Sequence, residues 1–241
     1  IFAIGYKVGP HFFGGLKKEG IHYLRISLIV AFSGLATAIA LTLNGRKPLV
    51  LERADEPNEL GAGLQLSPNA VRVLKQLGLA AELAEVSLRP HELVVRNART
   101  ARHLASMPIG MTAEERYGAP YHVLARPALH QLLTQACHGK GIEIRYGCEV
   151  ENYSARPGGI DISLAEGETI SAETLIGADG LWSKIRKAHW PGHAPKATGM
   201  TAWRATIAGD RAPRDPLAEP VVTAWLAPKL HAVTYPIDAT G

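Results

Sequence analysis

A strand–helix–strand pattern between residues 28 and 52 constrains the fold of this 241-residue chain most strongly. Residues 28–32 form an apolar run typical of a buried parallel strand, and the uncharged, alanine-rich stretch 34–43 predicts a helix. The Asn-Gly pair at 44–45 marks a helix end, and residues 48–51 read as the next strand. Such a unit predicts an α/β fold with a parallel sheet.

The acidic residue that follows this unit is a candidate nucleotide ligand. Glu52 lies 18 positions after Gly34, close to the spacing of roughly 20 residues at which a strand-end acid binds ribose hydroxyls. An exposed strand-end glutamate is the alternative. Of the GxGxxG turn that cradles a pyrophosphate, only Gly34 is present, and Phe32 would obstruct the phosphates. We therefore expect this chain to bind a dinucleotide weakly.

The same region allows a membrane segment as a second interpretation. No residue in the span 26–45 is charged, and its length approaches that of a bilayer-crossing helix. Serine, threonine and asparagine side chains make it only moderately apolar, so we prefer the cytoplasmic α/β unit and expect no membrane partner. Residues 1–26 have no clear period and stay unassigned.

Two further strings carry glycines or a proline at helix starts. The string GAGLQLSPNA at 61–70 predicts a side-chain-poor loop, a cap at Ser67 and a helix over 69–77. In the string RPALHQLL, Arg126 stands at the entrance of a helix that runs to about residue 137. An ordinary capped loop and a solvated arginine are the alternatives.

The string LIGADGLWSKIR at 175–186 predicts a buried strand, an Asp-Gly turn and a basic helix capped by Ser183. Residues 107–121 read as a loop with one helical turn. Short alternating segments predict strands around it. Strands at 92–97 and 102–106 are expected to begin the substrate-binding sheet. A meander is expected over 142–145, 148–154, 160–164 and 168–172. Further strands are expected at 199–207, 221–226 and 231–235.

Composition excludes several classes of function. The net charge is +4 and the pI near 9.1, but the lysines and arginines are scattered, so a nucleic-acid surface is not indicated. Cys137 and Cys148 form no metal-ligand spacing with histidines, so no metal site and no disulfide framework are expected.

Taken together, the strings at 175–186, 61–70 and 126–133 resemble the FAD-dependent aromatic-ring hydroxylases, which are similar to salicylate and hydroxybenzoate hydroxylases. The resemblance implies a Rossmann-like βαβ FAD-binding domain interleaved with a β-sheet substrate-binding domain. It also implies oxidation of a small phenolic or carboxylated aromatic by a flavoprotein monooxygenase that uses FAD, NAD(P)H and O2. The choice between NADH and NADPH and the oligomeric state stay open.

The resemblance also assigns roles to individual residues. Two sets contact the substrate: Arg204, His231 and Tyr235 as catalytic candidates, and Gln65 with Arg204 as substrate ligands. Edge-strand, packing or surface roles are the alternatives for these side chains. The cofactor-binding set consists of Gly34, Glu52, Arg53, Gly63, Leu64, Arg126, Asp179, Gly180 and Arg186.

The resemblance predicts domain boundaries as well. We expect an FAD-binding domain over 27–190, with 91–121 on the substrate side, and a partial substrate-binding sheet over 191–241. The family's second glycine-aspartate motif does not occur before Gly241, so we expect an incomplete fold. A catalytically silent domain, a quinone-precursor hydroxylase and a halogenase are the alternatives of the same fold.

Overall fold

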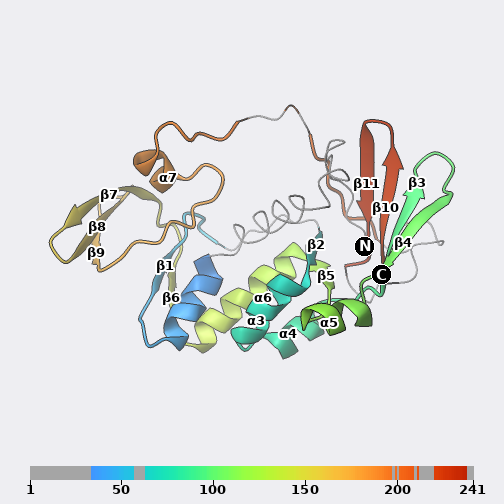
Figure 1. Cartoon of the computed structure of the whole chain (residues 1–241). Coiled ribbons are helices and arrows are strands. Elements are labelled where there is room, and N and C mark those ends of the chain that lie inside the picture. The colour runs from blue at the N-terminus through green and yellow to red at the C-terminus, as the bar shows by residue number, and fades with distance from the viewer. Residues whose placement is uncertain are drawn as a thin grey trace. The chain divides into compact units, whose positions relative to one another are not determined.

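The structure is a computed structural model in which the chain divides into two compact units (Figure 1). It describes residues 34–56, 63–196, 199, 201–208, 211 and 220–237. The first unit contains residues 63–132 and the described residues from 199 onward. The second contains 34–56 and 133–196, so the boundary lies within one helix, and the domain boundaries expected from the sequence stay a prediction.

The first unit is built on a four-stranded sheet. Its order is β11-β10-β3-β4, and only the central pair β10 and β3 runs parallel. The strands predicted at 92–97, 221–226 and 231–235 are confirmed within a few residues. The four strands are β3 (Glu92–Asn97), β4 (His103–Pro108), β10 (Val221–Ala227) and β11 (Leu230–Thr234).

A second, two-stranded sheet in this unit corrects the loop expected at 61–64. Residues Gly63–Leu66 form β2, which pairs antiparallel with β5 (His122–Ala125). A loop was expected because glycines favour turns, but a distant partner strand satisfies this backbone. Helices follow both strands: α3 (Pro68–Gln76) and α4 (Ala80–Glu85) after β2, and α6 (Arg126–Gly139) after β5. Proline stands at the start of α3, as predicted.

Before β5, the segment 107–121 contains more helix than the single turn expected. Strand β4 extends to Pro108, and α5 covers Met111–Tyr117. Gly118 ends the helix with a positive φ of 75°, where its N–H donates to the Glu114 carbonyl at 2.8 Å.

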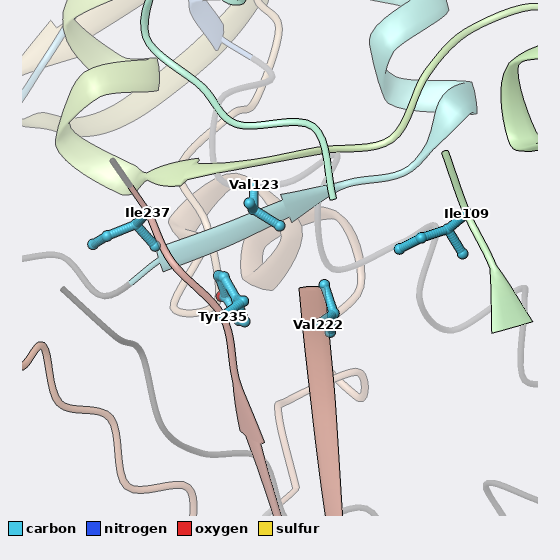
Figure 2. Packing of buried hydrophobic residues seen from close by; sticks show 5 residues of the cluster. All are labelled: Ile109, Val123, Val222, Tyr235 and Ile237. Carbon is cyan, nitrogen blue, oxygen red and sulfur yellow. The ribbon is translucent and has the colours of Figure 1, made fainter. Parts of the chain in front are cut away.

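The apolar core of the first unit joins both of its sheets. Figure 2 shows side chains contributed by β5, by β10 and by the residues just after β4 and β11. Val123 is fully buried, and the Tyr235 ring is 6% exposed. Segments that lie more than one hundred residues apart in sequence therefore share one core. Its buried members are Ile109, Val123, Val222, Tyr235 and Ile237.

The second unit contains the expected helix and a parallel strand pair, while the expected strand 28–32 lies outside the described residues. Residues 34–43 are helical, and Gly45 adopts the predicted left-handed conformation with a φ of 74°. Strand β1 (Leu49–Leu51) pairs parallel with β6 (Glu143–Arg145). The sequence had placed residues 142–145 in the meander. In the structure they pair parallel with β1, and the chain between these two strands includes α6, a helical connection of the kind that parallel strands require.

The meander itself is confirmed in its remaining three strands. It consists of β7 (Val150–Arg156), β8 (Gly159–Leu164) and β9 (Thr169–Ala172), paired antiparallel in that order. A Cβ on Gly159 would lie 2.5 Å from the Ala172 carbonyl oxygen, so this position requires glycine. Helix α7 (Lys184–His189) follows the Asp-Gly turn.

Two predicted strands are wrong within the described part of the chain. Residues 175–176 have no regular structure, and the Ile176 side chain is 51% exposed. Residues 199 and 201–208 are likewise irregular. A strand forms only where a partner backbone accepts its hydrogen bonds, and neither segment pairs with a strand among the described residues. Among the described helices, none is both long and apolar enough to span a bilayer.

Candidate functional site

The Asp-Gly turn of the second unit is built as a capped helix entrance. The Ser183 hydroxyl accepts a hydrogen bond from the backbone N–H of Arg186 at 2.9 Å, so Ser183 is the N-cap of α7, as predicted. Asp179 Oδ2 accepts from the N–H of Ile185 at 3.2 Å. Gly180 has a φ of 73°, which a residue with a side chain adopts only under strain. The turn is therefore held in one conformation.

These contacts set the ionisation of Asp179. Partial burial alone raises the pKa of its carboxyl group, but hydrogen bonds from Ser183 and from backbone N–H groups of Ile185 and Lys184 outweigh that effect. The pKa of Asp179 is lowered overall, so the side chain is a carboxylate at neutral pH.

Arg186 is used by the turn itself. Its guanidinium donates to the carbonyl oxygen of Gly180 at 3.4 Å and to that of Leu181. Arg186 therefore stabilises the backbone of the Asp-Gly turn. A contact between Arg186 and a cofactor stays a prediction. Arg53 is exposed. The pKa of Glu149 is lowered mainly by the hydrogen bond from Lys184, and the charge of Arg53 makes the smallest contribution.

The residues of this unit fit a dinucleotide at two points. A Cβ on Gly34 would lie 3.3 Å from the Ala178 Cβ, so the helix 34–43 approaches the segment that leads into Asp179 closely. Glu52 directly follows β1, and its Oε1 accepts from the N–H of Ala54 at 3.0 Å. The carboxylate therefore stands fixed at the carboxyl end of a parallel strand, where ribose hydroxyls bind in such folds.

In the first unit, strand pairing joins two of the strings found in the sequence. Gly63 lies opposite Ala125, the residue before Arg126, and Leu64 lies opposite Leu124. Gly63 is buried and Leu64 half-buried. Arg126 is the first residue of α6 and is half-buried too. The glycine string and the arginine string thus form one local structure, which the sequence alone did not predict.

A polar cluster lies on one face of this strand pair. The Tyr121 hydroxyl donates to Gln65 Oε1 at 2.7 Å. Burial raises the pKa of Tyr235 to about 12, whereas a hydrogen bond with the Gln65 side chain and the charge of Arg204 lower it. The structure therefore brings together three predicted site residues, Gln65, Arg204 and Tyr235. We define Gln65, Tyr121 and Tyr235 as the tyrosine–glutamine cluster.

Two site residues on the substrate side have different surroundings. Arg204 is exposed and lies in an irregular segment rather than on the expected strand. His231 lies on β11 opposite Leu226, and partial burial lowers its pKa. As alternate residues of a strand share a face, His231 and Tyr235 extend from the same side of that chain segment.

Sequence reasoning missed Tyr121. It had been included in a loop segment, although it immediately precedes the strand that leads to Arg126. The signal that identifies it is register: Tyr121 lies two residues before Val123, the partner of Gln65.

Comparisons with known proteins identify relatives of this chain. The 3-hydroxybenzoate 6-hydroxylase 1 of Aquipseudomonas alcaligenes is 35% identical over 205 residues, which are 85% of this chain and 52% of that protein. The 3-amino-4-hydroxybenzoate 2-monooxygenase PtnB3 of Streptomyces platensis is 36% identical over 222 residues, or 91% of this chain and 55% of that protein. The chain thus spans about half the length of these curated relatives.

Among solved structures, 2-methyl-3-hydroxypyridine-5-carboxylic acid oxygenase in its tetrameric form is similar in fold and sequence. The TM-score is 0.57 with 28% identity, covering 67% of this chain and 40% of that chain. The model of the FAD binding domain family matches residues 31–233. The Asp-Gly turn, the acid after β1 and the joined glycine and arginine strings are therefore parts of an α/β flavoprotein fold, and the chain belongs to the FAD binding domain family of the FAD-dependent monooxygenases.

Proposed function

We propose that this chain carries the cofactor- and substrate-contacting residues of an FAD-dependent monooxygenase that hydroxylates a small phenolic or carboxylated aromatic with NAD(P)H and O2. The observation that carries the proposal is the tyrosine–glutamine cluster beside Arg204, within the unit that also holds the glycine and arginine strings. Phenolic hydroxyls, an amide and a cation are the groups that a hydroxylated aromatic acid requires.

Each of the two units contributes residues that we propose hold the cofactor. In the second unit, Glu52 would accept from ribose hydroxyls, and the Asp179-Gly180 turn beside Gly34 would contact the pyrophosphate side. In the first unit, the backbone of Gly63 and Leu64 and the guanidinium of Arg126 would contact the flavin. Bound FAD supplies the redox and oxygen chemistry, and the protein holds and shields the reactants.

The substrate-holding residues come from the first unit. Arg204 would bind a substrate carboxylate through its forked N–H donors, since this geometry matches a carboxylate. The Tyr235 hydroxyl stays protonated at neutral pH, because burial raises its pKa to about 12, and it would donate a hydrogen bond that stabilises the phenolate oxygen of the substrate. His231 would serve as a proton acceptor, since burial favours its neutral form.

Turnover tests this proposal directly. The chain is incubated with excess FAD, NADH or NADPH and a panel of hydroxybenzoates and aminohydroxybenzoates, and product formation is measured by liquid chromatography. We expect substrate-dependent NAD(P)H oxidation with a hydroxylated product. The relatives named above are monooxygenases, which weighs against the silent-domain alternative. Substrate-independent oxidation without product would refute the proposal.

Replacement of Arg204 separates substrate binding from cofactor binding. The Arg204→Ala variant should bind an aromatic carboxylate about ten- to a hundredfold more weakly, because a charge-assisted bidentate contact is lost, while its FAD content is unchanged. Arg99→Ala, in the exposed turn between β3 and β4, is the matched control. If the Arg204→Ala variant binds the substrate as tightly as the parent does, a cation other than Arg204 binds the substrate carboxylate.

Equilibrium dialysis against FAD measures the cofactor side. We expect weak binding, because Ala31, Phe32 and Ser33 occupy the place of the glycine turn, although these residues lie outside the described part of the chain. Asp179→Ala should weaken FAD retention further and slow reduction by NAD(P)H. Tight stoichiometric FAD binding by the parent chain would contradict the expected weak binding. If Asp179→Ala retains FAD and is reduced as fast as the parent, Asp179 is not part of the site.

A further inference from the structure

Helix α7 follows the Asp-Gly turn but has little packing of its own. All of its residues, Lys184–His189, lie in the described part of the chain, and none of their side chains is buried. A helix this short gains little from its own hydrogen bonds and depends on tertiary contacts. The position of α7 in the second unit therefore depends on the contacts made at its two ends.

Strand β7 and the residue before it contact both ends of α7. At the start of the helix, Lys184 Nζ donates to Glu149 Oε1 at 2.6 Å. At its end, the His189 ring lies edge-on to the Tyr153 ring, with 5.9 Å between their centroids. The first contact is a charge-assisted hydrogen bond, and it adjoins Ser183, the cap of the helix. The Lys184–Glu149 pair is thus the contact that lies on the side of the Asp-Gly turn.

The backbone on the Glu149 side is anchored to the end of β1. The N–H of Glu52 donates to the Arg145 carbonyl at 2.9 Å, and the Glu52 carbonyl accepts from the N–H of Cys148 at 2.9 Å. Glu149 is the next residue, and its own carbonyl accepts from the N–H of Ala165 at 2.9 Å. The main chain of Glu149 is therefore fixed beside the strand end that carries the proposed ribose ligand.

These contacts form a continuous path between two proposed cofactor ligands. The path runs from Glu52 through the backbone to Glu149, and across the ion pair to Lys184, the first residue of α7. Asp179 Oδ2 accepts from the N–H of Ile185, the second residue of that helix, at 3.2 Å. The Lys184–Glu149 pair is the one link of this path that two side chains make. A single substitution can therefore remove it and leave the backbone bonds in place.

We propose that Glu149 is a positioning residue: its ion pair with Lys184 holds the Asp-Gly turn at a fixed distance from Glu52, so that both can contact the same bound FAD. The FAD contacts rest on the proposed function, whereas the path between the two elements rests on the contacts within the second unit. The paired side chains are 52% and 47% exposed, and an exposed pair adds little to global stability. We expect its effect on the turn rather than on unfolding of the whole chain.

The charges of the same pair predict a different result, which makes the test sharp. The pyrophosphate of FAD is anionic, so a nearby carboxylate repels it and an ammonium group attracts it. If charge alone mattered, Glu149→Gln would tighten FAD binding, Lys184→Met would weaken it, and the two effects would add. If the pair positions the turn, both variants bind FAD more weakly. The double variant then binds FAD no more weakly than Lys184→Met, since each single change already breaks the pair.

Hydrogen exchange measures the turn directly, by NMR on the full chain without FAD. The protection factor of the Ile185 N–H, which donates to Asp179, should fall about two- to fivefold in Glu149→Gln and in Lys184→Met, the range for an exposed ion pair. The double variant should show no greater fall, and Lys184→Arg, which keeps the charge, should match the parent. The N–H groups of β8 in the same unit are the internal reference and should be unchanged.

Equilibrium dialysis against FAD, at an ionic strength of about 0.15 M, measures the effect on the cofactor. We expect the dissociation constant of Glu149→Gln to rise about two- to fivefold. Arg156→Gln is the matched control, because it removes a comparably exposed ion pair with Asp161, of 2.9 Å, within the meander of the same unit. It should change neither FAD affinity nor the Ile185 protection factor. Circular dichroism checks that every variant is folded.

Several outcomes would overturn the proposal. They are equal or tighter FAD binding by Glu149→Gln, additive effects in the double variant, and an unchanged Ile185 protection factor. An equal effect of Arg156→Gln would overturn it as well, since the loss of any ion pair would then suffice. A chain that shows the coupled loss of protection but binds no FAD would refute the cofactor contacts of the proposed function and leave the positioning of the turn standing.

Discussion

Replacement of Thr223 by valine should stabilise the protein. Thr223 lies on β10, is 1% exposed, and its hydroxyl oxygen is buried with no hydrogen-bond partner among the described residues. Its register partner on β11, Thr234, is also buried, but the Thr234 hydroxyl accepts from the Trp225 indole N–H at 2.9 Å. Two cross-strand threonines therefore differ in one respect, the satisfaction of their hydroxyl groups.

The magnitude follows from this difference. A buried polar group without a partner costs roughly 1–3 kcal/mol, and valine has nearly the shape of threonine without the hydroxyl. We expect Thr223→Val to raise the free energy of unfolding by about 1 kcal/mol or more. For a chain of this length, each kcal/mol shifts Tm by about 2–4 °C. Thr234→Val should instead lower the free energy of unfolding by about 1 kcal/mol, because it leaves the Trp225 N–H without its acceptor.

Urea denaturation followed by tryptophan fluorescence and by circular dichroism measures both variants. Thr223→Ser is a third variant that keeps the hydroxyl and loses a methyl group, and it should destabilise the protein by about 1 kcal/mol. The reasoning is refuted if Thr223→Val destabilises the protein as much as Thr234→Val does, because the Thr223 hydroxyl would then have a partner in the folded chain.

The Asp-Gly turn yields three further predictions. Because the pKa of Asp179 is lower in the folded chain than in the unfolded one, its carboxylate stabilises the fold above the unfolded pKa of about 3.9, and this contribution is lost as pH falls through the folded pKa. Asp179→Asn should therefore lower Tm at pH 7 and flatten its decline on acidification, and an unchanged acid limb would exclude this role. Ser183→Ala should cost about 1 kcal/mol in urea denaturation through loss of the α7 cap, and should move the acid limb to higher pH. Gly180→Ala should cost about 1–2 kcal/mol although nothing lies within 4 Å of its added Cβ, because the φ of 73° is unfavourable; a Tm equal to that of the parent would contradict this.

Local signals in the sequence predicted the elements whose boundaries are set by neighbouring residues. The helix ending at Asn44-Gly45, strand β3, the proline-led start of α3 and the cap of α7 by Ser183 all appear where the sequence places them. Each depends on side chains within one or two turns of the same segment: a left-handed glycine, an alternating face, a fixed proline φ or a hydroxyl cap. The residue strings that resemble the hydroxylases also led to the family that the comparisons confirm.

Pairing between distant segments was decided only by the tertiary structure. The sequence placed residues 63–66 in a loop and 142–145 in the meander, whereas the first pairs with β5 and the second with β1. It predicted a strand at 175–176, which is irregular in the described structure. The contact of Tyr121 with Gln65 spans 56 residues and had no counterpart in the sequence analysis. The side chains of a strand determine which of its faces is apolar. Its partner, however, is the distant segment whose unpaired N–H and C=O groups lie beside it, and that proximity arises only in the folded chain.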